Sequence, residues 1–214
     1  RFKAGFIDLL FPPRCMGCDR EGSFLCPSCA EKLPRLLPPF CLRCAEPISW
    51  GTLCERCAHA SLAVDGIRSP FLMEGAIRQG IHQLKYQGMR ALATPLAQLM
   101  ADYWLKERPW TVDVLVPTPL HSHRLRERGY NQSALLAKRI GKELHLPVAP
   151  GVLVRRREAP PQARAGSAEE RRAHVQGAFL CPAQSLAGGS VLLIDDVCTT
   201  GATLDACAVA LKEA

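Results

Sequence analysis

Three stretches of the chain place hydrophobic residues three or four positions apart, which is the spacing of one helix face. Pro95 fits the first turn of the second stretch, where its missing N–H costs nothing. Asn131 or Ser133 fits the cap of the third. A fourth helix is expected from Thr203 onward. The stretches span residues 75–88, 92–105 and 131–144, and their apolar positions are Ile77, Ile81 and Leu84, then Leu92, Leu96, Leu99 and Met100, then Leu136, Ile140 and Leu144.

Short apolar runs between these helices predict β-strands at residues 112–117, 152–154 and 191–194. The run Val-Leu-Leu-Ile at 191–194 is unbroken, as expected for a central parallel strand covered on both faces. Strands that alternate with helices predict an α/β domain with an open, mostly parallel sheet and flanking helices. Ligands of such sheets bind beyond the carboxyl ends of the strands.

Composition sets the size of this domain. With 214 residues, 48% of them hydrophobic, the chain is long enough for one core plus an appendage. It has no run of 18 apolar residues, so no membrane span is expected. It also shows no secretory signal, and a cytoplasmic location is therefore expected.

The net charge of +7 is concentrated in the middle of the chain. Residues 121–172 hold 12 Lys/Arg against 5 Asp/Glu, and the rest of the chain holds 15 of each. Such a span favours an anionic partner, which is a phosphate, a pyrophosphate or a nucleic acid. The alternative is a solvated basic surface.

Eight of the 11 cysteines form four C-x-x-C pairs near the N-terminus. Two such pairs can complete a tetrahedral sulfur shell around Zn²⁺. Four thiolates leave no open position on the metal, so one or two structural zinc sites are expected rather than a reaction centre. The short intervals favour pairing in chain order, while crossed pairing or a single filled site stays open. The ligands are Cys15, Cys18, Cys26 and Cys29, then Cys41, Cys44, Cys54 and Cys57.

We therefore expect two domains. Residues 1–60 would form an N-terminal helix and a double zinc ribbon, and residues 61–214 would form the α/β domain. The N-terminal helix is predicted from the spacing of Phe2, Phe6 and Leu9, and it would dock on a neighbouring surface. Little core is available to the ribbons, so the metal would supply much of their folding energy.

The strand at 191–194 runs into two adjacent carboxylates, Asp195 and Asp196, and then into small residues. Carboxylates suit the hydroxyl groups of a sugar. The free N–H groups at the start of the following helix suit a phosphate, and Gly201 would let the anion approach the backbone. A phosphorylated sugar matches both halves, and Mg²⁺ would relieve repulsion between the acids and a pyrophosphate.

An apolar strand, two acids and then small-x-Thr-Gly-x-Thr resembles the loop that binds phosphoribosyl pyrophosphate (PRPP) in type I phosphoribosyltransferases. Together with Val-Pro-Thr-Pro-Leu at 116–120, Leu-Lys-Tyr-Gln-Gly at 84–88 and the double zinc ribbon, the chain resembles the ComF/GntX family along nearly its whole length. Members of this family are associated with DNA uptake in natural competence or with the use of external DNA. The resemblance implies a type I phosphoribosyltransferase fold and transfer of a phosphoribosyl group to a nitrogen nucleophile, with release of pyrophosphate.

The resemblance also implies residue roles. Asp195 and Asp196 would take the ribose hydroxyls and form the catalytic pair. The other PRPP-binding residues would be Cys198, Thr199, Thr200, Gly201, Ala202 and Thr203, around the 5′-phosphate. The pyrophosphate would lie at Pro117, Thr118, Pro119 and Leu120, with Lys85, Arg124 and Arg128 as further candidates, although Lys85 also fits a solvent-facing position on its helix.

Residues 155–179 are rich in Pro, Gly and charge and predict a mobile loop, which in this fold closes over PRPP. Their arginines suit a pyrophosphate or a nucleic-acid backbone equally. The alternative function is a non-catalytic accessory protein that binds single-stranded DNA through the zinc ribbons and this basic loop, with a helicase of the uptake machinery as a further partner. The family pattern continues with one more strand after the last helix, so we expect that the given chain stops before the fold is complete.

Overall fold

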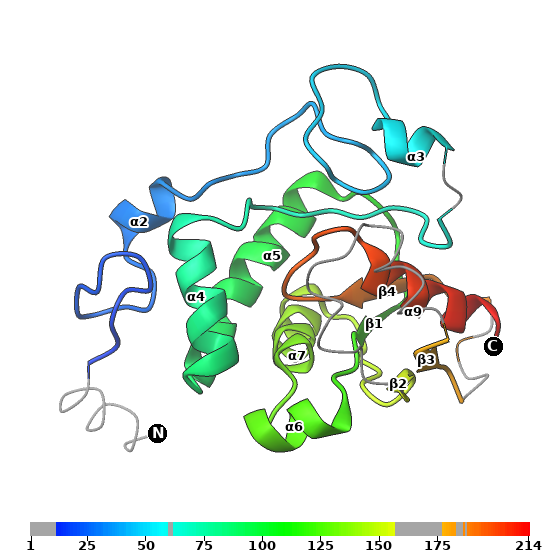
Figure 1. The fold of residues 1–214 in the computed structure, drawn as a ribbon. Coiled ribbons are helices and arrows are strands. Elements are labelled where there is room, and N and C mark those ends of the chain that lie inside the picture. Colours follow the sequence, from blue (N-terminus) through cyan, green and yellow to red (C-terminus); the bar gives the residue numbers. More distant parts are fainter. Residues whose placement is uncertain (1–11, 60–61, 157–176, 183–185, 187) are drawn as a thin grey trace.

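The structure is a computed structural model and describes residues 12–59, 62–156, 177–182, 186 and 188–214. The helix expected at residues 1–10 and most of the loop expected at 155–179, including Arg157, lie outside these ranges. Figure 1 shows a Cys-rich N-terminal part above and beside an α/β body. The α/β class and the preceding ribbon module are confirmed.

Two short metal-ribbon units open the chain. The first ribbon, residues 12–33, contains α2 (Pro27–Glu31), and the second ribbon, residues 39–59, contains α3 (Glu55–His59). A connecting segment, residues 62–72, then leads into the α/β body. The second ribbon packs on the connecting segment that follows the expected domain boundary at position 60. Leu62 and Ile67 share one buried cluster with the four cysteines of this ribbon.

The helices follow the predicted periodicity closely. They are α4 (Gly75–Tyr86), the 3-10 turn η1 (Arg90–Leu92), α5 (Ala93–Glu107), α6 (Ser122–Arg128), α7 (Gln132–Leu144) and α9 (Ala202–Lys212). Pro95 lies in the first turn of α5, as expected. Asn131 caps α7 by accepting a hydrogen bond from the Ser133 N–H. No helix among the described residues is long and apolar enough to cross a membrane.

The main sheet pairs β1 (Val114–Pro117) with β4 (Val191–Ile194) in parallel. A single parallel bridge between Leu115 and Val148 extends it on the β1 side. Pro147 and Pro150 flank Val148, and proline has no N–H for a ladder, so pairing stops there.

The strand expected at 152–154 is not part of this sheet. It is β2 (Val154–Arg155), which pairs antiparallel with β3 (Phe179–Leu180) in a separate two-stranded ribbon. The mostly parallel sheet is thus smaller in the described residues than the sequence pattern predicts.

Helices cover both faces of the main sheet (Figure 1). Leu84 of α4, Leu115 of β1 and Leu136 of α7 are fully buried in the larger core cluster. On the other face, Val116 of β1 packs with Cys207 of α9. The strand β4 departs from expectation, since only Ile194 is buried and its other three residues are half-buried. The cavity described below runs along this strand and explains their exposure.

Candidate functional site

The eight cysteines gather into two clusters, and within each cluster the four sulfur atoms lie within 4.8 Å of one another. Cys18 and Cys26 bring their sulfurs to 3.7 Å, and Cys44 and Cys54 bring theirs to 3.6 Å. A tetrahedral zinc with bonds of about 2.3 Å separates its sulfurs by about 3.8 Å, so the geometry fits the metal. Pairing follows chain order, as predicted, and both clusters fit structural zinc.

Hydrogen bonds from backbone N–H groups lower the pKa of one cysteine in each cluster. Burial opposes ionisation of Cys15, but the N–H groups of Cys26 and Gly17 lower the pKa of its thiol to about 6. In the second cluster burial likewise opposes ionisation, and the N–H groups of Cys54 and Cys44 lower the pKa of Cys41 to about 6. Metal ligation needs thiolates, so each ribbon favours the binding form of at least one ligand.

The two predicted acids lie at the carboxyl end of β4, as expected from the strand. Asp195 Oδ1 accepts hydrogen bonds from the hydroxyls of Thr118 and Ser133, both at 2.9 Å. It also accepts one from the Asp196 N–H at 2.9 Å. Burial, and then the charge of Asp196, raise the pKa of Asp195 to about 7. The carboxylate is therefore held inside a cage of donors.

The second acid is paired with a cation from a distant helix. Asp196 Oδ2 lies 2.5 Å from the Lys85 ammonium, and the two side chains are only 4% and 19% exposed. Gln132 of α7 donates to Asp196 Oδ1 at 3.4 Å. Arg128 in turn donates to Gln132 Oε1. Lys85 is thus a member of the site and not a solvent-facing helix residue.

Three of the predicted segments therefore meet at one point. Lys85 comes from α4, Thr118 follows β1, and the acid pair, Asp195 and Asp196, follows β4. Arg128 reaches this group through Gln132, whereas Arg124 is exposed on α6. Three more residues were predicted to bind the pyrophosphate. Pro117 is the last residue of β1 and is buried, and Pro119 and Leu120 lie in the turn that follows and are half-buried.

Residues 197–203, here called the phosphate loop, join the acid pair to α9. Gly201 has a φ of +76°, a left-handed conformation that favours glycine, and the helix begins at Ala202, one residue before the expected start at Thr203. Thr199 is exposed and Thr200 is half-buried. Burial, and then the charge of Asp195, raise the pKa of Cys198 to about 11. Cys198 is therefore a neutral thiol at pH 7, which disfavours a nucleophilic role.

Sequence patterns did not reveal two members of the site. Gln132 and Ser133 are polar residues buried in the first turn of α7, where they reach the acid pair. One sequence signal pointed to them. Asn131 was predicted as a cap, so the two residues that follow it were expected in the first turn of α7. Their approach to β4 depends on how α7 packs against the sheet.

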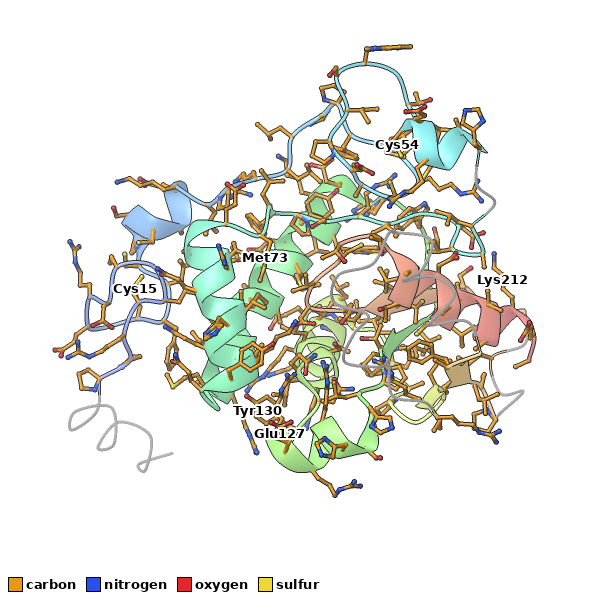
Figure 2. All side chains as sticks on the ribbon, in the orientation of Figure 1. Cys15, Cys54, Met73, Glu127, Tyr130 and Lys212 are labelled. Atoms are coloured by element: carbon orange, nitrogen blue, oxygen red, sulfur yellow. The ribbon has the colours of Figure 1, made fainter. Side chains whose placement is uncertain are left out.

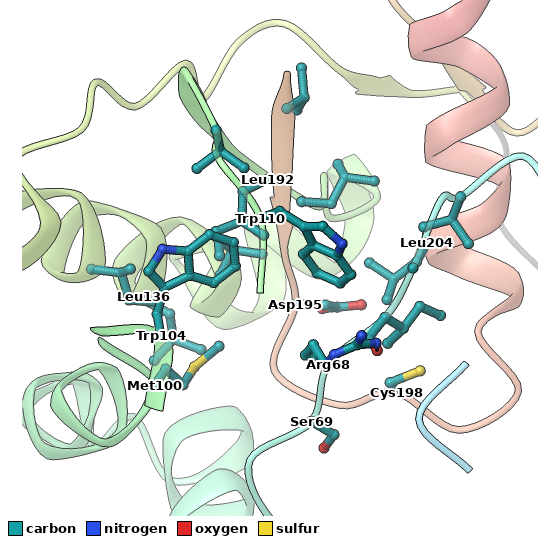
Figure 3. A pocket seen from close by; sticks show the side chains of 18 of the residues that line it. Arg68, Ser69, Met100, Trp104, Trp110, Leu136, Leu192, Asp195, Cys198 and Leu204 are labelled. Atoms are coloured by element: carbon teal, nitrogen blue, oxygen red, sulfur yellow. Dashed lines mark hydrogen bonds between the residues drawn. The ribbon is translucent and has the colours of Figure 1, made fainter. Parts of the chain in front are cut away.

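A cavity of ≈ 510 Å³ adjoins the acid pair. Figure 3 shows Trp104 and Trp110 on one side of it, Leu192 behind them, and Asp195 and Cys198 toward the phosphate loop. The Arg68 guanidinium lies 4.7 Å from the ring centroid of Trp110. The cavity is mainly apolar and aromatic, with carboxylates at one end, which is typical of a site for a small organic molecule.

Comparison with known proteins gives matches over both parts of the chain. A model of the double zinc ribbon domain matches residues 6–58. Competence protein ComFC of Bacillus subtilis is 29% identical over 195 residues, covering 88% of this chain and 78% of that protein. Competence protein F of Haemophilus influenzae is 28% identical, with 85% and 81% covered. DNA utilization protein YhgH of Escherichia coli is 30% identical over 197 residues, with 89% and 78% covered. No solved structure matches.

Proposed function

The chain belongs to the ComF/GntX family of competence and DNA-utilisation proteins, and from this premise we propose that it binds PRPP and transfers its phosphoribosyl group to a nitrogen nucleophile. The observation that carries the proposal is the meeting of Lys85, Thr118 and the acid pair at the carboxyl edge of β1 and β4. A parallel α/β sheet binds ligands at this edge. The phosphate loop beside it ends in a helix N-terminus, which favours a phosphate.

In the proposed reaction, the lone pair of the nitrogen attacks the anomeric carbon of the ribose. The bond from that carbon to the pyrophosphate oxygen breaks, and pyrophosphate leaves with the electron pair. The nitrogen then releases its proton to solvent. The protein forms no covalent bond in this scheme, which agrees with the neutral thiol of Cys198.

Lys85 links the two halves of the proposed site. It now neutralises Asp196 in a pocket where both side chains are largely buried. Pyrophosphate carries more negative charge than one carboxylate, so it would draw the ammonium away from Asp196. That exchange would release the Asp196 carboxylate to accept a ribose hydroxyl. Binding of the leaving group and of the sugar would thereby be coupled.

In the proposed complex, Mg²⁺ has no ligand among the side chains of this chain. Carboxylate oxygens are the right class of donor for it. However, the Lys85 ammonium lies 2.5 Å from Asp196 Oδ2 and occupies the place where a cation would neutralise this group. A Mg²⁺ ion that arrives with pyrophosphate would offset the charge of the phosphates.

The acceptor would enter the cavity beside the acid pair. Trp104 and Trp110 form an aromatic wall of the cavity that suits a flat ring. Asp195 lies at the end of the cavity nearest the phosphate loop (Figure 3). A nitrogen heterocycle bound there would direct its nitrogen toward the sugar.

Calorimetry with PRPP and Mg²⁺ tests the proposal. The wild-type protein should release or take up heat, and the double variant Asp195→Asn with Asp196→Asn should not. Asp113→Asn is the matched control, because Asp113 lies at the opposite end of the same strand pair and binds the Ser190 N–H. The control should bind normally. Undiminished binding by the double variant, with its zinc content intact, would remove the assignment.

A second candidate function, binding of single-stranded DNA, is favoured by one surface. Tyr86 is 69% exposed. The centroid of its ring lies 4.9 Å from the centroid of the His82 ring. The Arg128 guanidinium lies 5.6 Å from the same ring. Exposed aromatic rings beside arginines are typical of sites where bases stack.

Tyr130 is the aromatic residue that lies within the basic span of the sequence, but it is not part of this surface. Tyr130 is buried, and its hydroxyl donates to the Leu84 carbonyl. Tyr86 comes to α6 from a different segment. Fluorescence anisotropy with an oligo-dT should show about tenfold weaker binding for Tyr86→Ala and little change for Tyr86→Phe. Equal affinity of all three proteins would dismiss this surface.

A further inference from the structure

The junction of α6 and α7 contacts both partners of the buried ion pair. Gln132 donates to Asp196 Oδ1 at 3.4 Å, which holds the acid from one side. Two residues earlier, the Tyr130 hydroxyl donates to the carbonyl of Leu84, the residue before Lys85. Two nearby residues of one junction therefore hold the two elements whose separation sets the distance between the ammonium and the carboxylate.

The Leu84 carbonyl depends on this tyrosine for a hydrogen bond. Carbonyls in the last turn of a helix lack the N–H groups of a following turn, and α4 ends two residues later. The N–H groups of residues 87 and 89 both donate to the carbonyl of Gln83 instead. Leu84 is fully buried, which excludes water from its carbonyl. The Tyr130 hydroxyl is therefore the donor that the packing of α4 supplies.

Arg90 holds the same junction from the far end of this segment. Its guanidinium lies 4.5 Å from the centroid of the Tyr130 ring, and its Nη2 donates to the Gly129 carbonyl at 3.3 Å. Gly129 has a φ of +76°, and a Cβ there would lie 3.2 Å from the same nitrogen, so this close approach favours glycine. The segment 84–90, which contains Lys85, is thus tied to the junction at both ends.

A fixed backbone matters at this position because lysine is long and flexible. Its ammonium is carried on a flexible carbon stem, so contact with Asp196 Oδ2 at 2.5 Å requires that the stem begin at the right place. In the proposed reaction the ammonium moves from Asp196 toward pyrophosphate. An anchored backbone at Leu84 confines that movement to the Lys85 side chain and keeps both anions within its reach.

We propose that Tyr130 is a positioning residue of the candidate site, whose hydroxyl fixes the backbone at Leu84 and thereby places the Lys85 ammonium between Asp196 and the pyrophosphate of PRPP. The inference rests on the proposed function where it concerns pyrophosphate, whereas the placement of Lys85 against Asp196 stands without it. Burial of Tyr130 keeps this role separate from the exposed surface at Tyr86.

NMR of lysine ammonium groups gives a test that does not depend on PRPP. An ammonium held in a buried ion pair exchanges its protons slowly with water, and the Lys85 signal is assigned by its loss in Lys85→Met. Tyr130→Phe removes only the hydroxyl, and exchange at Lys85 should become about fivefold faster, as for the loss of one hydrogen bond. Arg90 is exposed, so Arg90→Met should fold normally, and it should accelerate exchange about twofold.

Leu153→Val is the matched control for a general loss of stability. Leu153 is 3% exposed and belongs to the core cluster beside α9, whose described members include no residue of α4. Loss of one buried methylene group destabilises a protein about as much as loss of a buried hydroxyl that makes one hydrogen bond. The control should leave exchange at Lys85 unchanged.

Calorimetry with PRPP and Mg²⁺ then tests the link to the ligand. Tyr130→Phe should bind about fivefold more weakly than the wild type, because Lys85 is held less well. Leu153→Val should bind normally. If the wild-type protein binds PRPP and Tyr130→Phe binds it equally well, the pyrophosphate half of the inference is wrong.

The two measurements separate the possible failures. If the wild type does not bind PRPP but exchange accelerates in Tyr130→Phe and not in Leu153→Val, the proposed function is wrong and the positioning of Lys85 stands. Unchanged exchange in Tyr130→Phe, or equal acceleration in Leu153→Val, overturns the inference. So does a wild-type protein without a slowly exchanging Lys85 signal, because it would have no ion pair to position. Should Tyr130→Phe fail to fold, Arg90→Met is compared with the control in the same way.

Discussion

The two ribbons hold the same set of four sulfurs but have different neighbours. In the first ribbon, Met16 is buried against α4, where a Cβ on Gly80 would lie 2.4 Å from its sulfur. In the second ribbon, the cysteines themselves join the core beside Leu204. Figure 2 shows Cys15 next to α4 and Cys54 in the other ribbon, well apart from it. Identical metal chemistry thus supports two different parts of the candidate site.

The first ribbon supports the helix that carries Lys85, and the second supports the phosphate loop. The exposure of the ligands differs accordingly, since Cys18 is exposed whereas Cys44 is buried. Loss of the second metal should therefore disturb the core directly. Loss of the first should disturb mainly one face of α4.

The largest expected effect comes from breaking one cluster at a time. Cys44→Ser should lower the free energy of unfolding by about 4 kcal/mol or more, and Cys18→Ser, at the equivalent position, by about 2 kcal/mol. Zinc stoichiometry should fall from two to one in both. Hydrogen exchange should accelerate at residues 197–203 only in Cys44→Ser. Equal exchange in the two variants would contradict the division of roles.

A smaller effect is expected at the ion pair that the first ribbon supports through α4. Lys85→Met leaves the Asp196 carboxylate buried without its cation and should cost about 2–4 kcal/mol in urea unfolding. Adding Asp196→Asn removes the buried charge and should restore most of the loss. If the two substitutions are additive, Lys85 and Asp196 do not interact in solution, and the exchange proposed for PRPP binding fails.

The smallest effect is a pH dependence at the end of β4 that leads into the phosphate loop. The pKa of Asp195 is raised to about 7, above its value of about 3.9 in an unfolded chain, so the folded state binds more protons between these values. Stability should therefore fall by about 1 kcal/mol as pH rises from 6 to 8. Asp195→Asn should remove this dependence. A wild-type protein whose stability is constant over this range would place the pKa of Asp195 near its ordinary value.

Local sequence patterns predicted much of the fold. Helical periodicity located α4, α5 and α7, and the apolar run at 191–194 located β4. The strand predicted at 152–154 is β2, which begins two residues later, at Val154, and pairs with β3, whereas the segment that bridges β1 is at Val148. Its antiparallel partner β3 comes 24 residues later, at a distance where sequence periodicity holds no information on pairing.

The sequence by itself determined the eight metal ligands and the order of acids, small residues and helix start after β4. These features depend on spacing within a few residues, where backbone geometry leaves little choice. Tertiary structure alone decided that Lys85 pairs with Asp196, that Tyr86 lies beside Arg128, and that the second ribbon packs beside Cys198 and Leu204. Those neighbours come from separate segments, and only the packing of helices and ribbons on the sheet brings their charges together.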